Sequence, residues 1–176
     1  MKRLHIIGRK NHGKSTLVAE LVAYLKRQGH RVGTIKHTHH QHELDTPGKD
    51  SHRHRQAGAD VVGILSPTMN ALFWEPTVND NTSDRYAEFE ARFSDCDLVL
   101  VEGDSRTTAA KIEVWRSEVG SEPIALQDRS ILAVVTDDAL DASITTLSRR
   151  DIPKLAAWVV LRLGLASEGD SCIIKT

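Results

Sequence analysis

A run of eight residues near the N-terminus carries the clearest chemistry in the sequence. The run GRKNHGKS, residues 8–15, matches G-x-x-x-x-G-K-[ST] at every fixed position. Glycines let such a loop curl until its backbone amides face an anion. The lysine of the motif reaches the β- and γ-phosphates of a nucleotide, and the hydroxyl of the last residue ligates Mg²⁺. The residues predicted to bind a nucleotide are Gly8, Asn11, His12, Gly13, Lys14, Ser15 and Thr16.

The residues that flank this motif are those that a phosphate-binding loop requires. Arg3–Ile7 predicts a short strand directly before the loop, and apolar residues recur at helical spacing from Leu17 to Leu25. Gly29 then gives a stop signal, and Arg31–Lys36 predicts a second strand. A strand, a helix and a strand within about thirty-five residues form a βαβ unit, which implies a parallel sheet. This context argues against a chance match in a glycine-containing loop.

A phosphate loop also needs a carboxylate at the end of a neighbouring strand, to hold magnesium directly or through water. Glu102 closes the apolar strand predicted at Asp97–Val101 and precedes Gly103, so it is our candidate metal ligand beside the serine of the loop. A solvated carboxylate at a strand end is the alternative. A second carboxylate comes from Asp45, assigned to the metal, or from Asp50, although either could equally cap a turn or a helix.

The segment from residue 37 to residue 58 is polar and rich in histidine. All nine histidines fall between His5 and His54, and six of them lie between His37 and His54. Imidazole is a common metal ligand, but no Cys-x-x-Cys or His-Glu-x-x-His motif accompanies these residues. Because the segment is also cationic, we favour contact with phosphate or another anionic ligand over a metal site or a solvated loop. The residues predicted to bind this ligand are Lys36, His37, Lys49, Asp50, Arg53 and Arg55.

The remaining pattern predicts an α/β fold of the P-loop NTPase type, with a mostly parallel sheet, flanking helices and an added β-hairpin. Two apolar runs, Asp60–Leu65 and Ala71–Trp74, flank a turn and predict adjacent strands. Asp151 is a predicted N-cap for the last helix. Helices are predicted over Lys49–Gln56, Thr82–Phe93 and Ile152–Leu163, and strands over Lys111–Trp115 and Ile131–Val135. We expect one domain over residues 1–165, followed by a tail, 166–176, that carries no strong signal and could be disordered.

Bulk composition narrows the class of protein. A chain of 176 residues suits one domain with a sizeable core. Its net charge of −1 gives no electrostatic reason to expect a nucleic acid or an anionic membrane as partner. The apolar runs are too short to span a bilayer, and the N-terminus does not read as a signal peptide. Cys96 and Cys172 lie far apart and form no disulfide framework. We expect a cytoplasmic protein.

Several stretches between Arg3 and about Leu163 together resemble the MobB family, the molybdopterin-guanine dinucleotide biosynthesis adaptor proteins. Besides the phosphate loop, they are Lys36–His40, Asp45–Ser51, Arg53–Ala59, Val101–Gly103 and Lys111–Val114. The sequences PGKDS and RHRQAGA, which lie in the second and third of these stretches, are much more particular to the family than the phosphate loop is. The resemblance implies a GTP- and Mg²⁺-binding accessory protein with weak GTPase activity. Such proteins support the attachment of GMP to molybdopterin by a partner, the guanylyltransferase MobA.

The resemblance also implies a homodimer that pairs partly through strands, and we place that pairing in Asp60–Trp74. Two departures from the family pattern matter. Asp104-Ser105-Arg106 follows Glu102-Gly103, where the family often has an aromatic and a basic residue. In addition, no Asn-Lys-x-Asp motif is present to read guanine. Asp137 follows a predicted strand at the position of a base-reading loop, and we predict that it accepts the N1 and N2 protons of guanine.

Two other functions fit parts of the sequence. A metal-insertion GTPase that delivers nickel or another ion would use the clustered histidines, among them His37, His39 and His40. A P-loop kinase acting on a small metabolite would need an acceptor-binding signature, and the sequence shows none. For the leading hypothesis we expect slow hydrolysis until a partner completes the site, because no residue stands out as a general base.

Overall fold

The computed structural model describes residues 1–41, 43–76, 84–140 and 143–165. The chain divides into two compact units, one of residues 1–38 and 91–176 and the other of residues 39–90. Each unit is described by itself. The predicted tail, 166–176, and the first two residues of the helix predicted at Thr82–Phe93 lie outside the described residues. The organisation of residues 1–165 as one domain stays a prediction.

The first unit is built on a six-stranded parallel sheet with the strand order β2-β5-β1-β6-β7-β8. Its strands are β1 (Arg3–Ile7), β2 (Val32–Lys36), β5 (Leu98–Glu102), β6 (Lys111–Val114), β7 (Ile131–Val135) and β8 (Thr146–Leu147). Because all the strands are parallel, their carboxyl ends meet at one edge of the sheet, which is where ligands bind in open α/β sheets. The phosphate loop follows β1, Glu102 is the last residue of β5, and Asp137 comes shortly after β7, all at this edge.

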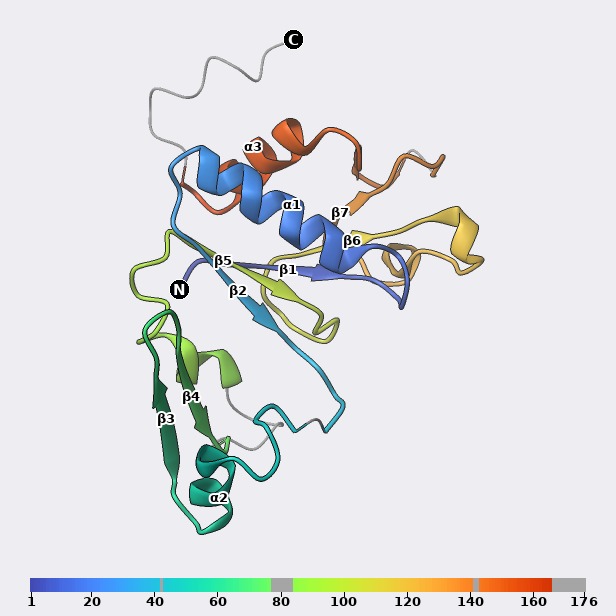
Figure 1. Ribbon diagram of the computed structural model, residues 1–176. Coiled ribbons are helices and arrows are strands. Elements are labelled where there is room, and N and C mark those ends of the chain that lie inside the picture. The colour runs from blue at the N-terminus through green and yellow to red at the C-terminus, as the bar shows by residue number, and fades with distance from the viewer. Residues whose placement is uncertain (42, 77–83, 141–142, 166–176) are drawn as a thin grey trace. The chain divides into compact units, whose positions relative to one another are not determined.

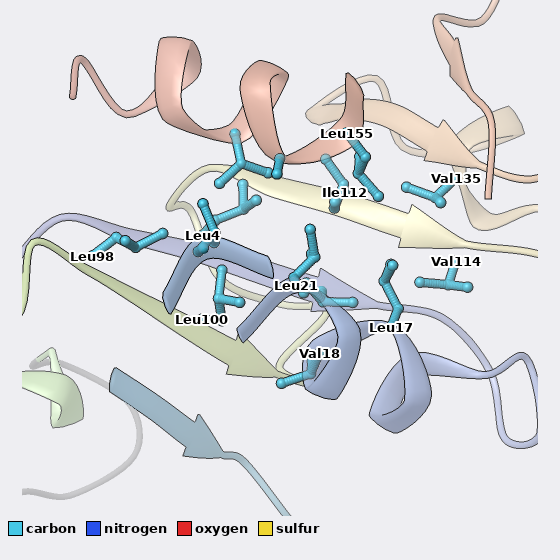
Figure 2. Close-up of a cluster of buried hydrophobic side chains, with 14 of the residues drawn as sticks. Leu4, Leu17, Val18, Leu21, Leu98, Leu100, Ile112, Val114, Val135 and Leu155 are labelled. Atoms are coloured by element: carbon cyan, nitrogen blue, oxygen red, sulfur yellow. The ribbon is translucent and has the colours of Figure 1, made fainter. Parts of the chain in front are cut away.

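Helices α1 (Lys14–Arg27) and α3 (Ile152–Arg162) cover one face of this sheet, as Figure 1 shows. The carboxylate of Asp151 accepts a hydrogen bond from the Lys154 amide at 3.0 Å, so the predicted N-cap of α3 is confirmed. Apolar side chains from β1, β5 and β6 fill the layer between sheet and helices (Figure 2). The labelled members are Leu4, Leu17, Val18, Leu21, Leu98, Leu100, Ile112, Val114, Val135 and Leu155. Among the described residues, no helix is long and apolar enough to cross a membrane.

The opposite face of the sheet carries buried polar groups under loops and two short 3₁₀ helices, η2 (Ser117–Val119) and η3 (Ile124–Leu126). Side chains alternate along a strand, so β1 and β6 direct every second residue to this face. Lys111 is 4% exposed, and its ammonium lies 2.8 Å from a carboxylate oxygen of Asp128. Glu113 is 1% exposed and accepts the amides of Ile124 and Ala125, each at 2.9 Å. Both buried charges therefore have partners, as burial requires.

The second unit contains α2 (Asp50–Gln56), an antiparallel hairpin of β3 (Val61–Leu65) and β4 (Asn70–Trp74), and the 3₁₀ helix η1 (Arg85–Phe89). The hairpin prediction is confirmed. The helix predicted at Thr82–Phe93 is confirmed only in part, because its described residues form the shorter 3₁₀ helix η1. Tyr86 is buried, and the Phe89 ring packs on Trp74 with centroids 5.3 Å apart. Apolar residues spaced by three suit three residues per turn as well as 3.6, so the pattern does not separate the two helix types.

Candidate phosphate-binding site

The loop between β1 and α1 is curled in the way that an anion cradle requires. Gly8, Asn11 and Gly13 have φ angles of 142°, 69° and 89°. In the described part of the chain, no backbone carbonyl accepts a hydrogen bond from the amides of residues 10–13. Gly13 stands at the N-cap of α1, and no side chain caps the helix. The loop amides and the first turn of α1, which includes Thr16, are therefore available to an anion.

Two of the three residues predicted to hold magnesium, Ser15 and Glu102, come together at the start of α1 and the end of β5. The Ser15 hydroxyl donates a hydrogen bond to Oε1 of Glu102 at 2.7 Å, although 87 positions separate them. Lys36 pairs with Glu102 in the register of β2 and β5. A hydroxyl and a carboxylate oxygen at this distance form the hard oxygen pair that Mg²⁺ prefers. The hydroxyl and carboxylate thus fit the cation, which they would hold beside the phosphates.

Lys14 lies over the loop, in a cationic environment. Its ammonium donates to the carbonyl of Arg9 at 2.7 Å. Burial lowers the pKa of Lys14, Lys36 lowers it further, and the Glu102 carboxylate acts in the opposite direction. Glu102 and Lys36 therefore lie close enough to Lys14 to act on its ammonium. His37 follows Lys36, and its amide donates to the Glu102 carbonyl at 2.9 Å.

The His12 side chain is bonded to protein on both sides of its ring. Its Nδ1 accepts the Arg116 amide at 2.9 Å, and its Nε2 lies 2.9 Å from the Ser121 hydroxyl. The imidazole is 0% exposed, and burial together with the charges of Lys14, Arg9 and Arg116 lowers its pKa. Sequence reasoning placed His12 in the phosphate loop correctly but gave no sign that its ring fixes the loop after β6.

A cavity of about 550 Å³ opens at the carboxyl ends of β6 and β7. Its lining residues are Glu20, Trp115, Arg116, Glu118, Asp137, Asp138, Arg149, Arg150 and Ile152. Asp137, the predicted guanine reader, lines it, but its Oδ1 already accepts the Ser148 hydroxyl at 2.6 Å and the Arg149 amide at 3.0 Å. Oδ2 lies 3.4 Å from Nε of Arg150, whose side chain is 89% exposed. Oδ2 is therefore the oxygen that a base would meet.

Sequence reasoning missed the ion pairs that line this cavity. Arg149 pairs with Glu20 across α1 and the turn after β8, with 2.5 Å between Nη1 and Oε2. Arg116 lies at the end of β6 and pairs with Glu118 at 3.2 Å. No local pattern marks these residues, because their neighbours in space are distant in sequence.

The polar residues of the second unit form a network of their own. The Arg55 guanidinium and the His52 imidazole both contact the Glu43 carboxylate. The hydrogen bond from Arg55 is the main reason that the pKa of Glu43 is lowered to about 2. Arg55, predicted to bind a ligand, thus holds the loop to α2. Lys49, Asp50 and Arg53 lie exposed at or beside the same helix.

Asp45 is the most buried carboxylate of the second unit, at 9% exposure. Its Oδ1 accepts the Thr46 amide at 2.7 Å and the Ser51 hydroxyl at 3.0 Å, which is the arrangement of a turn cap. Its Oδ2 is buried and has no hydrogen-bond partner among the residues that the structure describes. The contacts of Oδ1 explain the fold of the loop, and the metal role of Asp45 stays a prediction. Among the described residues, no group of three or more His, Cys, Asp or Glu residues could hold a metal ion.

His5 gives the stability of the fold a dependence on pH. Its side chain is 0% exposed beneath the turn that follows Glu102, and its Nδ1 lies 4.0 Å from Oδ2 of Asp104. Burial lowers the pKa of His5 to about 4, although the nearby Asp104 carboxylate raises this pKa and offsets part of the effect of burial. The unfolded chain binds a proton near pH 6.5 and the folded chain does not, so stability falls as the pH drops below 6.5. The loss approaches about 3 kcal/mol by pH 4.

We expect urea unfolding to show this loss as a fall of about 2 kcal/mol between pH 7 and pH 5. His5→Gln removes the titrating group, so its stability should change much less over that range, whatever its value at pH 7. His54→Gln alters an exposed histidine of α2 and should keep the wild-type slope. Equal slopes for His5→Gln and the wild type would contradict the assignment.

The order of the parallel sheet, the glycine loop between β1 and α1 and the hydroxyl–carboxylate pair define an α/β protein of the P-loop NTPase type. The family model described as molybdopterin guanine dinucleotide synthesis protein B matches residues 3–137. The chain belongs to this family, MobB.

Curated relatives and solved structures agree with this assignment. The chain is 37% identical over 149 residues to the molybdopterin-guanine dinucleotide biosynthesis adapter protein of Escherichia coli K12, covering 84% of this chain and 85% of the relative. It is 33% identical to the Haemophilus influenzae protein of the same name, covering 89% and 86%. A crystal structure of molybdopterin-guanine biosynthesis protein B has a TM-score of 0.66 at 27% identity, covering 92% and 99%. The MobB homologue of Bacillus stearothermophilus, at 23% identity, shares the fold with a TM-score of 0.65 over 94% and 100%.

Proposed function

We propose that this protein is a GTP-binding accessory protein of molybdenum cofactor biosynthesis. It supports the attachment of GMP to molybdopterin by a MobA-type guanylyltransferase and has weak GTPase activity of its own. The observation that carries the nucleotide part is the curled loop whose amides are available to an anion, beside Lys14 and the Ser15–Glu102 pair. The pathway part rests on family membership and on the names of the relatives.

Each element of the site has a distinct task in this proposal. Lys14 and the loop amides neutralise and orient the phosphate chain. Ser15 and Glu102 hold Mg²⁺, which neutralises charge on the β- and γ-phosphates when it is bound. Asp137 accepts hydrogen bonds from the N1–H and N2–H groups of guanine through Oδ2, a pairing that adenine does not offer. The exposed ion pair between Oδ2 and Arg150 competes only weakly with guanine for this oxygen, because exposed ion pairs contribute little to stability.

Calorimetry and an activity assay test the proposal together. The protein is titrated with GTP and with ATP, in magnesium and in EDTA, and is then added to a MobA guanylyl-transfer reaction with limiting GTP. We expect preference for GTP, tighter binding in magnesium, and stimulation of transfer. If GTP binds equally well in EDTA and in magnesium, the magnesium assignment is wrong. If ATP binds as tightly as GTP, the assignment of Asp137 to guanine is wrong. Absence of both stimulation and physical association with MobA would reject the adaptor role.

The cationic residues near α2 suit an anionic ligand, which in this proposal is the phosphate of molybdopterin. Lys49, Asp50, Arg53 and Arg55 of the second unit are the residues assigned to it, and Lys49 and Arg53 lie four positions apart and are both exposed. Lys36 and His37 belong to the first unit, and their role in binding an anion stays a prediction. Binding through such exposed cations weakens as salt rises. Titration with molybdopterin at increasing salt tests the assignment, and an affinity independent of salt would contradict it.

We propose that the protein is a homodimer that pairs through its hairpin. An isolated two-stranded hairpin is marginally stable, and this one exposes apolar side chains on one face. Val61, Leu65 and Leu72 are 59%, 88% and 43% exposed. Leu72→Glu should therefore shift sedimentation from dimer to monomer, because it places a charge in the paired surface. Leu161→Glu alters an exposed leucine of α3 and should leave the dimer intact. A wild-type monomer at all concentrations would reject the dimer.

A further inference from the structure

The loop after β6 holds a guanidinium against the phosphate loop. A Cβ atom on Gly13 would lie 3.0 Å from Nη2 of Arg116 and 3.4 Å from its Cζ. Arg116 also lines the cavity at the ends of β6 and β7. In a loop of this motif, the backbone amides cradle the α- and β-phosphates. We propose that Arg116 is a nucleotide-binding residue whose guanidinium contacts the diphosphate part of the bound nucleotide.

The ion pair of Arg116 with Glu118 does not prevent Arg116 from contacting a diphosphate. Nη1 lies 3.2 Å from Oε1 of Glu118, and the two side chains are 40% and 72% exposed. An exposed ion pair of this kind contributes little to stability. A phosphate can bind the planar guanidinium fork through two hydrogen bonds, whereas the contact with Glu118 joins one nitrogen to one oxygen. Arg116 can therefore exchange Glu118 for a phosphate at little cost.

His12 positions Arg116 from within the phosphate loop. Because Nδ1 accepts the Arg116 amide, that nitrogen carries no proton, and Nε2 must carry it and donate to the Ser121 hydroxyl. The indole of Trp115 donates to the Ser121 carbonyl at 2.7 Å, so Ser121 is held twice. The segment 116–121 is thereby fixed against the loop that binds the phosphates. His12 acts through Arg116 and is a positioning residue.

This inference rests on the proposed nucleotide binding. Its test measures the affinities of the wild-type protein and of several variants for GDP and for GTP. Arg116→Ala should weaken both nucleotides by the same factor, about tenfold, because both contain the diphosphate. Arg116→Lys keeps the charge and should recover part of the loss. Arg129→Ala alters an exposed arginine before the amino end of β7, at the opposite edge of the sheet, and should bind as the wild type does. Melting temperatures show whether each variant is folded.

The outcomes separate this inference from the proposal on which it rests. A folded Arg116→Ala protein with wild-type affinity for both nucleotides overturns the role of Arg116 and leaves the proposed function standing. A loss confined to GTP also overturns the inference, because it moves the contact to the γ-phosphate. A wild-type protein that binds neither GDP nor GTP rejects the inference and the proposed function together.

A double-mutant cycle on GDP affinity tests the part played by His12. His12→Phe removes both ring hydrogen bonds, and if it acts through Arg116, adding it to Arg116→Ala should cause no further loss. The amide oxygen of His12→Asn stands near the place of Nδ1 and can accept the Arg116 amide, so this variant should keep most of the affinity. Additive losses in the double variant, or an Asn variant as weak as the Phe variant, would overturn the positioning role.

Discussion

Gly8→Ala should destabilise the protein by about 3 kcal/mol or more and abolish nucleotide binding. Gly8 has a φ of 142°, a conformation that side chains other than hydrogen rarely adopt. A Cβ atom there would lie 2.5 Å from the Val114 carbonyl oxygen. That carbonyl belongs to β6 in the middle of the sheet, so it cannot move aside as a flexible side chain does. The new methyl group must therefore displace the start of the phosphate loop.

Urea unfolding and GTP titration of the same preparation measure the two effects. Gly29→Ala is the matched control, because Gly29 has a φ of 89° but nothing within 4 Å of the added Cβ. The Gly29→Ala variant has the backbone strain without the steric clash. Its free energy of unfolding should fall by only about 1 kcal/mol, and its GTP affinity should not change. A Gly8→Ala protein no less stable than Gly29→Ala would show that the close approach of β6 does not constrain the loop.

Lys14→Ala should reduce GTP affinity about 100-fold or more. The lysine supplies the only side-chain cation of the fixed motif, and its loss removes charge-assisted hydrogen bonds that each contribute about 1.5–3 kcal/mol. Lys14 already lies over the loop, with its ammonium 2.7 Å from the Arg9 carbonyl. It needs only to exchange that carbonyl for phosphate oxygens. Isothermal titration of the variant with GTP measures the loss.

Lys10→Ala controls for the general loss of a positive charge near the site. Lys10 lies in the same loop, but its side chain is exposed and occupies a variable position of the motif. We expect a change of less than about threefold, which is what a screened charge at the surface contributes. Wild-type GTP affinity in Lys14→Ala would contradict the cradle assignment, and so would equal losses in the two variants.

The sequence predicted those parts of the fold that leave a local signature. Strands β1, β5 and β7 are short apolar runs, and α1 repeats its apolar residues at helical spacing. The predicted bounds of these four elements differ from the observed ones by a few residues at most. The prediction that Ser15 and Glu102 serve one site also relied on a simple rule, that the carboxyl ends of parallel strands meet. The 2.7 Å contact between them confirms their proximity.

The parts that the sequence did not predict depend on contacts between distant residues. Strand β8 has only two residues, which is too short for a pattern to develop. The 3₁₀ helices η2 and η3 also escaped prediction because each is a single turn. The bonds of His12 to Arg116 and Ser121 join residues more than 100 positions apart. Nothing near His12 in the sequence indicates these partners, and its predicted contact with a nucleotide stays a prediction.

The connection between β2 and β5 is unusually long for two neighbouring parallel strands. These strands are neighbours in a parallel sheet, and such neighbours are usually joined by a single crossover helix. Here the chain between them forms the whole second unit, residues 39–90. Insertions at such a connection leave the pairing of the strands intact. Selection can therefore remodel the second unit while the parallel sheet and the curled loop between β1 and α1 keep their geometry.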